Sequence, residues 1–356
     1  MEPFEIHVPQ ADLDDLADRL ARTRWPAELP DAGNDYGLPL AQLRSLADHW
    51  QHGYDWRKQE AEFNSYPQFT TEIDGERIYF LHVRSADPDA LPLILTHGFP
   101  GSVAEFLDVI EPLSNDFHLV IPSIPGFGFA GPTRAGGWDV QRVARAWATL
   151  MAELGYQRYG AQGGDWGSAI SRALGAHDAE HVVGVHLNYL PMPPPANNDG
   201  LSAEDRRRVE QMRRYLANQP GFRIMQSTTP QSVGYLLTDS PIAQLSWIAE
   251  RFLDWSDPAT PISVDRQLTD VMLYWLTRTA GSAARLHKES PVGPLPCPVP
   301  IGVAVFAHDI VRSIRAIAGQ TYQIAHWNEF DRGGHFAALE VPDLFAADVR
   351  AFFKSL

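Results

Sequence analysis

Cysteine and long apolar stretches are scarce in this chain of 356 residues, and each scarcity excludes a class of protein. The single cysteine, Cys297, allows neither an intrachain disulfide nor a zinc site built from cysteines, which predicts a reducing, cytoplasmic location. No run of about 18 apolar residues is present, and the acidic N-terminus lacks the apolar core of a signal peptide, so no association with a membrane is expected.

Positive charge is also in short supply. The chain has 29 Lys and Arg against 44 Asp and Glu, which gives a net charge of −15. Because contacts to phosphate need clustered basic side chains, this balance argues against binding to nucleic acid. The hydrophobic share of 44% is ordinary for a folded protein, and the length allows one large domain or two. Composition therefore favours a globular enzyme.

Short apolar runs alternate with helical patterns in two parts of the chain. The helical patterns of the first part cover 103–113, 140–154 and 168–174, and a last helix is expected over 344–353. Strands are predicted at 78–83, 93–96, 119–122, 158–162, 182–187, 301–306 and 322–327. Apolar strands that alternate with helices are typical of the α/β class, with a mostly parallel, doubly wound sheet.

Two proline-rich stretches, PMPPPANNDG from residue 191 and PVGPLPCPVP up to residue 300, interrupt this alternation. The sequence between them predicts helices over 203–217, 242–253 and 264–280. A helical block inserted into a doubly wound sheet is typical of a cap over the site. We therefore expect an N-terminal meander over 1–85, a core made of 86–190 and 297–356, and a helical cap over 191–296.

The sharpest local signal is the pentapeptide Gly163-Gly164-Asp165-Trp166-Gly167, which separates a predicted strand from a predicted helix. This strand–turn–helix context is that of a nucleophile elbow, with Asp165 in the place of the more familiar serine. Small residues are needed on both flanks because the turn is tight. The pentapeptide alone fits equally well a glycine-rich turn whose aspartate merely caps the helix.

A second loop, from Thr96 to Ser102 with the sequence THGFPGS, directly follows the predicted strand 93–96. In the α/β-hydrolase fold the oxyanion hole consists of the amide after the nucleophile and one amide from an early strand–helix loop. The backbone N–H groups of Trp166 and Phe99 would occupy these two positions.

A histidine and an acid follow the last two predicted strands. His335 lies in Arg332-Gly333-Gly334-His335-Phe336, where the fold places its general base, and Asp309 lies just past the strand 301–306, where an orienting carboxylate belongs. Glu329 and Asp331 are rivals for the acid, but they are less well placed to reach the ring from behind. The order Asp165, Asp309, His335 matches nucleophile, acid and base in an α/β-hydrolase.

With these residues in place, the chain resembles the epoxide hydrolases of the microsomal and juvenile-hormone type, in a soluble form like those of bacteria or fungi. The resemblance covers nearly the whole length and implies an α/β-hydrolase fold, an inserted helical cap and an N-terminal segment that meanders over the core and helps to hold the cap. The motifs that carry it are RTRWP (22–26), the stretch 50–69, HGFPGS (97–102), GGDWGS (163–168), TDSP (238–241), MLYW (272–275) and GGHFAALE (333–340).

The resemblance also implies a mechanism without metal or cofactor. The carboxylate of Asp165 would attack the epoxide and form an alkyl ester, which water activated by His335 would hydrolyse. Asp309 would orient His335, and the amides of Phe99 and Trp166 would hold the oxyanion. The partners implied are a small apolar epoxide and water. The oligomeric state stays open, with a homodimer as one option.

Two cap positions depart from the family pattern. The family uses two cap tyrosines to hydrogen-bond or protonate the leaving oxygen, and the cap motifs place them at Phe222 and His287. Phe222 has no donor, so it is expected only to line the pocket, whereas an imidazolium at His287 would be a stronger acid than tyrosine. His287 is therefore the expected acid for the leaving group, with Tyr215, Tyr235 or Tyr274 as candidate helpers.

Other interpretations stay open. The leaving group could be a halide, because Trp166 resembles the halide-contacting position of haloalkane dehalogenases. The chain could also be a specialised member that has lost general epoxide hydrolysis, or a binding protein without activity, although the complete set of three catalytic groups argues against the last option. Trp247 and Trp255 are expected to pack within the cap rather than line the pocket.

Overall fold

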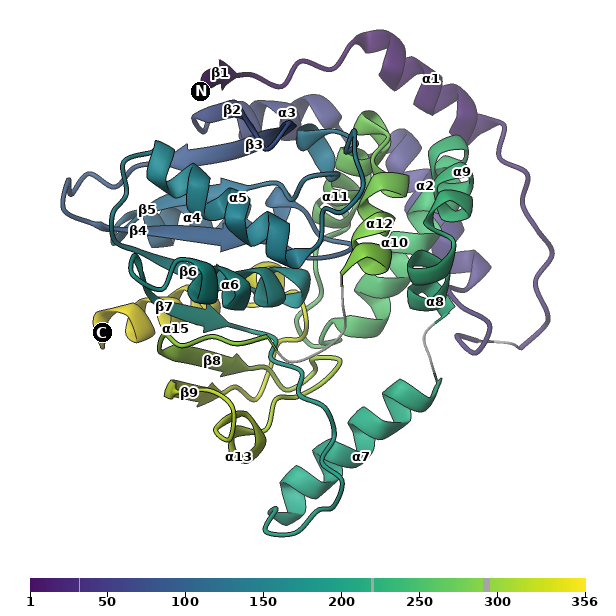
Figure 1. The fold of residues 1–356 in the computed structure, drawn as a ribbon. Helices are drawn as coiled ribbons and strands as arrows, with labels where there is room; N and C mark the ends of the chain where they lie inside the picture. The colour runs from purple at the N-terminus through teal and green to yellow at the C-terminus, as the bar shows by residue number, and fades with distance from the viewer. Residues whose placement is uncertain (32, 219–220, 291–294) are drawn as a thin grey trace.

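A twisted sheet forms the centre of the molecule in the computed structural model, which describes all residues except 32, 219–220 and 291–294 (Figure 1). The strand order within the described residues is β1-β2-β3-β5-β4-β6-β7-β8-β9. The strands from β5 to β9 in this order are parallel, and β1, β2 and β3 join them as antiparallel strands at one edge. Their bounds are β1 Glu2–Phe4, β2 Gln68–Ile73, β3 Glu76–Val83, β4 Leu91–Thr96, β5 Phe117–Pro122, β6 Tyr159–Gly163, β7 Val182–Leu187, β8 Ile301–Val305 and β9 Ile324–Glu329.

Helices cover both faces of this sheet. Every residue of β5, β6 and β8 is buried, as expected for apolar strands that are covered on two sides. The covering helices pack in two pairs, α5 (Val140–Glu153) with α6 (Asp165–His177), and α4 (Leu107–Ser114) with α15 (Pro342–Lys354). The prediction of a mostly parallel, doubly wound α/β-hydrolase sheet is therefore confirmed.

A block of helices lies between β7 and β8 in the sequence. Helices α8 to α12 gather beyond the carboxyl ends of the parallel strands, at the right in Figure 1, whereas α7 lies apart from them, near α13 (Arg315–Ala318). The block consists of α7 Ala203–Asn218, α8 Gly221–Thr228, α9 Pro230–Asp239, α10 Pro241–Trp255, α11 Val264–Thr277 and α12 Ala280–Glu289. Ligands of doubly wound sheets bind at the carboxyl ends of the strands, so this block covers the expected site.

The N-terminal segment contacts both the helical block and the core. Its helices are α1 (Gln10–Ala21), α2 (Leu40–His52) and α3 (Trp56–Asn64), and α1 packs against α2 and α10. On α11, Arg266 forms a bidentate ion pair with Glu62 of α3, at 2.6 and 2.7 Å, and a second pair with Asp108 of α4 at 2.6 Å. One arginine therefore joins three parts of the chain, and a planar guanidinium is well suited to such double contacts.

Several elements differ from the sequence prediction. The helix expected over 264–280 ends earlier, at Thr277, because Arg278 adopts a left-handed backbone (φ +55°) that separates α11 from α12. The helix expected over 103–113 begins as a short 3₁₀ helix, η1 (Val103–Phe106). Strands β1 and β2 and helices α8, α9 and α12 were not predicted. Pro220, two residues before Phe222, and 291–294, at the predicted exit of the cap, lie outside the described residues.

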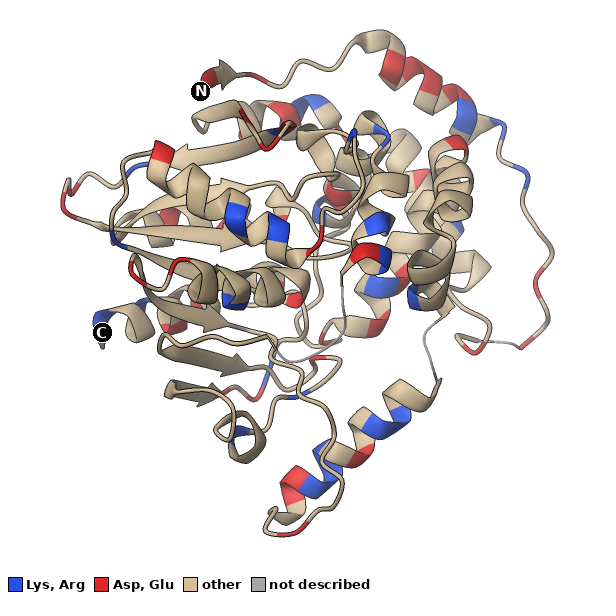
Figure 2. Cartoon of the chain, viewed as in Figure 1, with Lys and Arg blue, Asp and Glu red and all other residues tan. Residues whose placement is uncertain are grey.

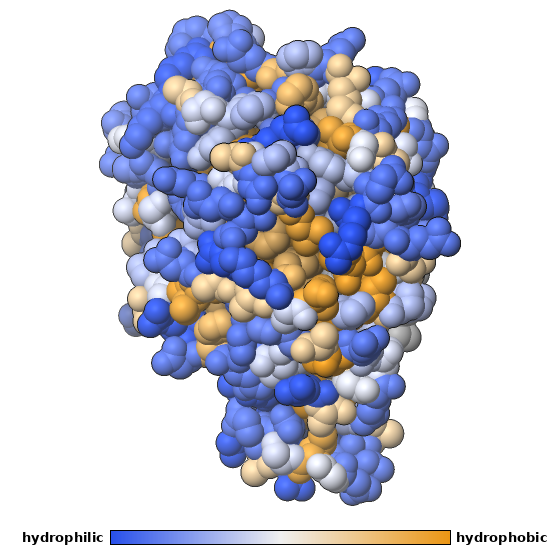
Figure 3. Space-filling model, turned by 90° about the vertical axis from the view of Figure 1, so that its left-hand side faces the viewer, coloured by the Kyte–Doolittle hydropathy of each residue, from blue (hydrophilic) through white to orange (hydrophobic). Residues whose placement is uncertain are grey.

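The surface is mostly polar. Residues of both charges lie along α7 (Figure 2), where Arg214 pairs with Glu210 at 3.5 Å. The face that lies at the left in Figure 1 is hydrophilic around an apolar area near its middle (Figure 3). In the part of the chain that the structure describes, none of the helices combines the length and the apolar character needed to cross a membrane.

Candidate active site

Asp165 stands at the first position of α6, directly after β6 and one linking glycine. Its backbone is left-handed (φ +46°), a conformation that residues other than glycine rarely adopt and that is typical of strained functional turns. A Cβ atom on Gly163 would lie 2.2 Å from the carbonyl oxygen of Gly167, and one on Gly167 would lie 1.9 Å from that of Thr96. The close packing therefore requires glycine on both sides of the aspartate.

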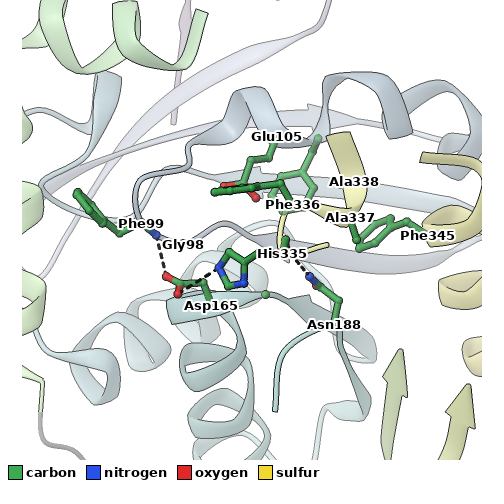
Figure 4. A pocket seen from close by; sticks show the side chains of 12 residues that line it. Gly98, Phe99, Glu105, Asp165, Asn188, His335, Phe336, Ala337, Ala338 and Phe345 are labelled. Atoms are coloured by element: carbon green, nitrogen blue, oxygen red, sulfur yellow. Dashed lines mark hydrogen bonds and ion pairs between the residues drawn. The ribbon is translucent and has the colours of Figure 1, made fainter. Parts of the chain in front are cut away.

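Two backbone amides hold the carboxylate of Asp165. The N–H of Phe99, in the loop after β4, donates to Oδ1 at 2.8 Å (Figure 4). Burial would raise the pKa of Asp165, but His335 and the N–H groups of Phe99 and Trp166 together hold it below its ordinary value. The carboxylate is therefore ionised at neutral pH, and its Oδ1 lies where donors would also stabilise an oxyanion.

His335 lies between two carboxylates. Its Nδ1 donates to Oδ1 of Asp309 at 2.7 Å, and its Nε2 lies 3.5 Å from Oδ2 of Asp165. The side chains of His335 and Asp309 are only 2% and 4% exposed. Burial alone would lower the pKa of the imidazole, but Asp309 and Asp165 outweigh it and raise the pKa to about 10. The resting ring is therefore an imidazolium.

The acid of this set comes from the loop after β8. Asp309 also accepts a hydrogen bond from the N–H of Ile310 at 2.7 Å, which fixes the carboxylate behind the ring. Of the two rivals, Glu329 forms an ion pair with Arg208 at 2.6 Å, and Asp331 is exposed to solvent.

Aromatic rings from the helical block cover the nucleophile loop. The ring of Phe222, on α8, stacks 6.4 Å from Phe99, measured between centroids. The ring of His287, on α12, lies 5.2 Å from Phe99 and 4.9 Å from Trp166, in both cases edge to face. Phe222 and His287, the two cap positions that differ from the family pattern, thus both contact residues whose amides face Asp165.

His287 differs electrostatically from the expectation. Burial lowers its pKa to about 4, so the ring is neutral near pH 7 and offers one N–H donor instead of an imidazolium. Its Nδ1 lies 2.9 Å from Nε2 of Gln226, whose Oε1 accepts a hydrogen bond from the indole of Trp247 at 2.9 Å. Trp247, which was expected only to pack, therefore supports a polar chain that continues through His287 to Trp166, whose indole N–H donates to Nε2 of His287 at 3.4 Å.

Trp255, at the end of α10, also does more than fill the cap. Its ring lies 5.1 Å from that of His335 and 5.4 Å from Phe222, and its carbonyl oxygen accepts the backbone N–H of His335 at 2.9 Å. It also lines, with Tyr215 and Asp309, an open cavity on this side of the site. Trp255 therefore packs, as expected, but it also lines this cavity, because α10 ends against the loop that carries the base.

The candidate helper tyrosines differ in their position. The hydroxyl of Tyr274 is buried and donates to the carbonyl oxygen of Gly101 at 2.7 Å. Tyr235 is 70% exposed, on the surface of α9. Tyr215 lines the open cavity, and burial raises its pKa to about 12. Of the three, Tyr215 is therefore the one with a place beside the catalytic groups.

Sequence reasoning missed three residues that line or contact the site. Tyr189 lies 5.1 Å from the ring of His335, edge to face, and Asn188 donates to the carbonyl oxygen of His335 at 3.4 Å. Both directly follow β7, so the rule that found Asp165 and Asp309 could have found them. The third, Glu105, lines a small cavity with Asp165 and His335 and has no strand in front of it.

The fold and this arrangement define an α/β hydrolase, and the family model described as alpha/beta hydrolase fold matches residues 92–280. The model described as epoxide hydrolase N terminus matches residues 1–106. A putative epoxide hydrolase of Stigmatella aurantiaca is 43% identical over 99% of this chain and 85% of that protein. The chain therefore belongs to the epoxide hydrolase family, and it is an enzyme of the hydrolase class.

Solved structures agree with this assignment. The epoxide hydrolase of Aspergillus niger has a TM-score of 0.93 and 33% identity, over 99% of this chain and 96% of that one. The juvenile hormone epoxide hydrolase of the silkworm Bombyx mori also has a TM-score of 0.93, with 29% identity over 99% and 94% of the two chains. The resemblance stated from the sequence is confirmed, and the alternative of a haloalkane dehalogenase is not favoured.

Proposed function

We propose that this enzyme hydrolyses a small, largely apolar epoxide to a diol through an ester on Asp165. The observation that carries the proposal is the placement of that carboxylate, with the N–H of Phe99 at 2.8 Å from one oxygen and Nε2 of His335 at 3.5 Å from the other. A carboxylate can attack a saturated carbon and form an ester that water then cleaves. The N–H of Phe99 and the ring of His335 can therefore act both in the formation of the ester and in its hydrolysis.

In the first step Oδ2 of Asp165 attacks an epoxide carbon, and the electrons of the broken C–O bond move to the epoxide oxygen. The N–H of neutral His287 hydrogen-bonds this oxygen as charge develops, because the ring lies over the nucleophile loop. The alkoxide needs one proton, and the imidazolium of His335 must lose one before it can act as a base. The proton of the imidazolium therefore passes to the alkoxide, which leaves a hydroxyl group on the ester and a neutral ring on His335.

In the second step the ester no longer carries the negative charge of Asp165. The pKa of His335 depends partly on that charge, so it falls, and the neutral ring takes a proton from water. Asp309 keeps the ring oriented, and the N–H groups of Phe99 and Trp166 stabilise the oxyanion formed from the ester carbonyl. Collapse releases the diol and restores the carboxylate.

The rings of Phe99, Phe222 and Trp255 favour an apolar, aromatic substituent on the epoxide. The division into meander (1–85), core (86–190 and 297–356) and cap (191–296) belongs to the same proposal, since α8 and α12 carry the rings over the nucleophile. A cytoplasmic location fits the single buried cysteine, Cys297.

Single turnovers with styrene oxide in water labelled with oxygen-18 test the proposal. Water attacks the ester carbonyl, so the label should enter the carboxylate of Asp165 and be absent from the first diol released. Label in the first diol would mean that water attacks the epoxide directly. The chain should release no halide from haloalkanes under the same conditions, and halide release without diol would reverse the assignment.

A further inference from the structure

A second carboxyl group lies beside the catalytic one. Glu105, in the 3₁₀ helix η1, lines a small cavity together with Asp165, His335 and Phe336 (Figure 4). The volume of this cavity is about 10 Å³, close to what one water molecule requires. Four side chains able to hydrogen-bond a water border it, namely two carboxyls, an imidazole and the amide of Asn188, and a buried water typically has two to four such partners.

The fold reserves space for the carboxyl of Glu105. A Cβ atom on Gly101 would lie 1.2 Å from its Oε1, so any larger residue at that position would displace the carboxyl group. The backbone of Gly98, in the same loop, hydrogen-bonds to the carboxyl. This loop also carries Phe99, so Glu105 is fixed to the segment that supplies an amide to Asp165.

The surroundings of Glu105 keep it uncharged. Burial raises its pKa well above the ordinary value, and the nearby carboxyls of Asp270 and Asp165 raise it further, while His335 opposes them. A neutral carboxylic acid has one donor and a free carbonyl acceptor. A charged Glu105 would be a third anion near His335 and would keep the ring protonated when it must act as a base.

We propose that Glu105 positions the water that hydrolyses the ester on Asp165. This inference rests on the proposed function and adds a residue to its second step. The carbonyl oxygen of Glu105 accepts one hydrogen of the water, and Nε2 of His335 accepts the other. The lone pair of the water oxygen then points at Cγ of Asp165.

All protons are accounted for in this step. The water oxygen bonds to Cγ of Asp165, its proton passes to His335, and the carbonyl electrons move to the oxygen held by the amides. The ester C–O bond then breaks, and the alcohol oxygen takes the proton back from His335. The second hydrogen of the water remains on the carboxyl group of Asp165 until it passes to His335, which restores the carboxylate and the imidazolium. Glu105 keeps its own proton throughout, so it is a positioning residue and does not act as a base.

Rapid-quench mass spectrometry with styrene oxide separates ester formation from ester hydrolysis. In Glu105→Met, which has a similar length but no acceptor, we expect ester formation within about threefold of the wild type. Hydrolysis should slow by about 100-fold, so that the ester accumulates. Glu105→Gln should recover most of the hydrolysis rate, because its amide retains an uncharged carbonyl acceptor.

Glu111 on α4 offers a control. It is a glutamate that is exposed to solvent and does not line the cavity. Glu111→Met should leave both rates within about threefold of the wild type. Thermal melting of each variant checks that the fold is kept, and Glu105→Asn, with a shorter amide, replaces Glu105→Met if that variant does not fold.

Two results would overturn the role of Glu105 alone: unchanged ester hydrolysis in Glu105→Met, or equal slowing of both steps, which would indicate a structural role. A wild-type enzyme that forms diol without any ester would overturn the proposed function and this inference together. Detection of the ester in the wild type therefore distinguishes a failure of the role of Glu105 from a failure of the proposed function.

Discussion

Nε2 of His335 faces Oδ2 of Asp165 at 3.5 Å, so the base rests against the group whose ester it must later hydrolyse. This distance is longer than a normal hydrogen bond, and the contact is chiefly an attraction between opposite charges. Formation of the ester removes one of these charges. The chemical step that creates the ester therefore also converts His335 from an imidazolium into a base.

Removal of the charge at Asp165 should lower the pKa of His335. In Asp165→Asn the imidazolium loses one of the two carboxylates that raise its pKa to about 10, while burial continues to oppose the charged form. Titration of the ring by NMR checks this expectation. The exposed Asp87→Asn serves as the control and should leave the titration unchanged. An equal pKa in Asp165→Asn and the wild type would contradict the proposed change of role.

His335→Gln should trap the ester. The amide cannot take a proton from water, so hydrolysis should slow by about 10²- to 10⁴-fold while Asp165 still attacks the epoxide. Intact mass should then rise by the mass of the substrate, on the peptide that contains Asp165, and Asp165→Ala should form neither adduct nor diol. His52→Gln, at an exposed histidine on α2, is the control and should turn over normally. The absence of an adduct with every epoxide tested would argue against covalent catalysis.

Phe222→Tyr should speed ester formation on general epoxides. The ring of Phe222 stacks on Phe99 beside His287, so an added hydroxyl would supply a second donor near the leaving oxygen. One hydrogen bond of about 1.4 kcal/mol in the transition state corresponds to about tenfold in rate. Single-turnover rates over a panel of epoxides measure the effect, with Phe69→Tyr, on the distant strand β2, as the control. A lower rate across the panel would indicate a pocket specialised for a substrate that needs Phe222.

His287→Phe tests the donor at the other cap position. Loss of its N–H should slow ester formation by about tenfold and leave ester hydrolysis unchanged. Because the pKa of His287 is about 4, this residue should not titrate between pH 6 and 8. The rate of ester formation should therefore depend on pH in the same way in the wild type and in His287→Phe over this range. A pH step in this range that the substitution abolishes would mean that the imidazolium is the acid.

The parts of the site that were predicted from the sequence depend on local order. Asp165, Asp309 and His335 each follow a parallel strand, and all such strands end at one edge of the sheet. The place of Trp255 depends instead on where α10 ends in space, which no local pattern encodes. The uncharged state of Glu105 likewise depends on burial by segments that are distant in the sequence.

In the fold, too, the elements with a clear local pattern were predicted and the others were not. Strand β1 has only three residues, and β2 mixes buried and half-buried positions, so neither has the apolar run by which the parallel strands were found. The helix predicted over 264–280 extended past the true end of α11, because the left-handed residue there is Arg278 and not the usual glycine. Helix α12, which carries His287, was not predicted, so sequence reasoning assigned His287 to the cap but not to a helix.

A buried polar cluster away from the active site should control stability. Asp348, on α15, is 3% exposed and accepts hydrogen bonds from His186 at 2.9 Å, from His326 at 2.8 Å and from Asn328. It joins the last helix to β7 and β9. Asp348→Ala leaves these partners unsatisfied and should lower the free energy of unfolding by about 3–5 kcal/mol. Asp343→Ala, at an exposed position on the same helix, should change it by less than about 0.5 kcal/mol.

The same cluster sets a pH dependence whose sign follows from Asp348. Burial would raise the pKa of this carboxyl, but its bonds to His186, His326 and Asn328 lower it from 3.8 to about 2. The ionised group therefore stabilises the fold above about pH 4, and this contribution is lost as the pH falls toward 2. Urea unfolding at pH 7, 4 and 2.5 measures it, and the difference between wild type and Asp348→Ala should shrink at the lowest pH. A difference that stays constant would mean that packing, and not charge, makes Asp348 important.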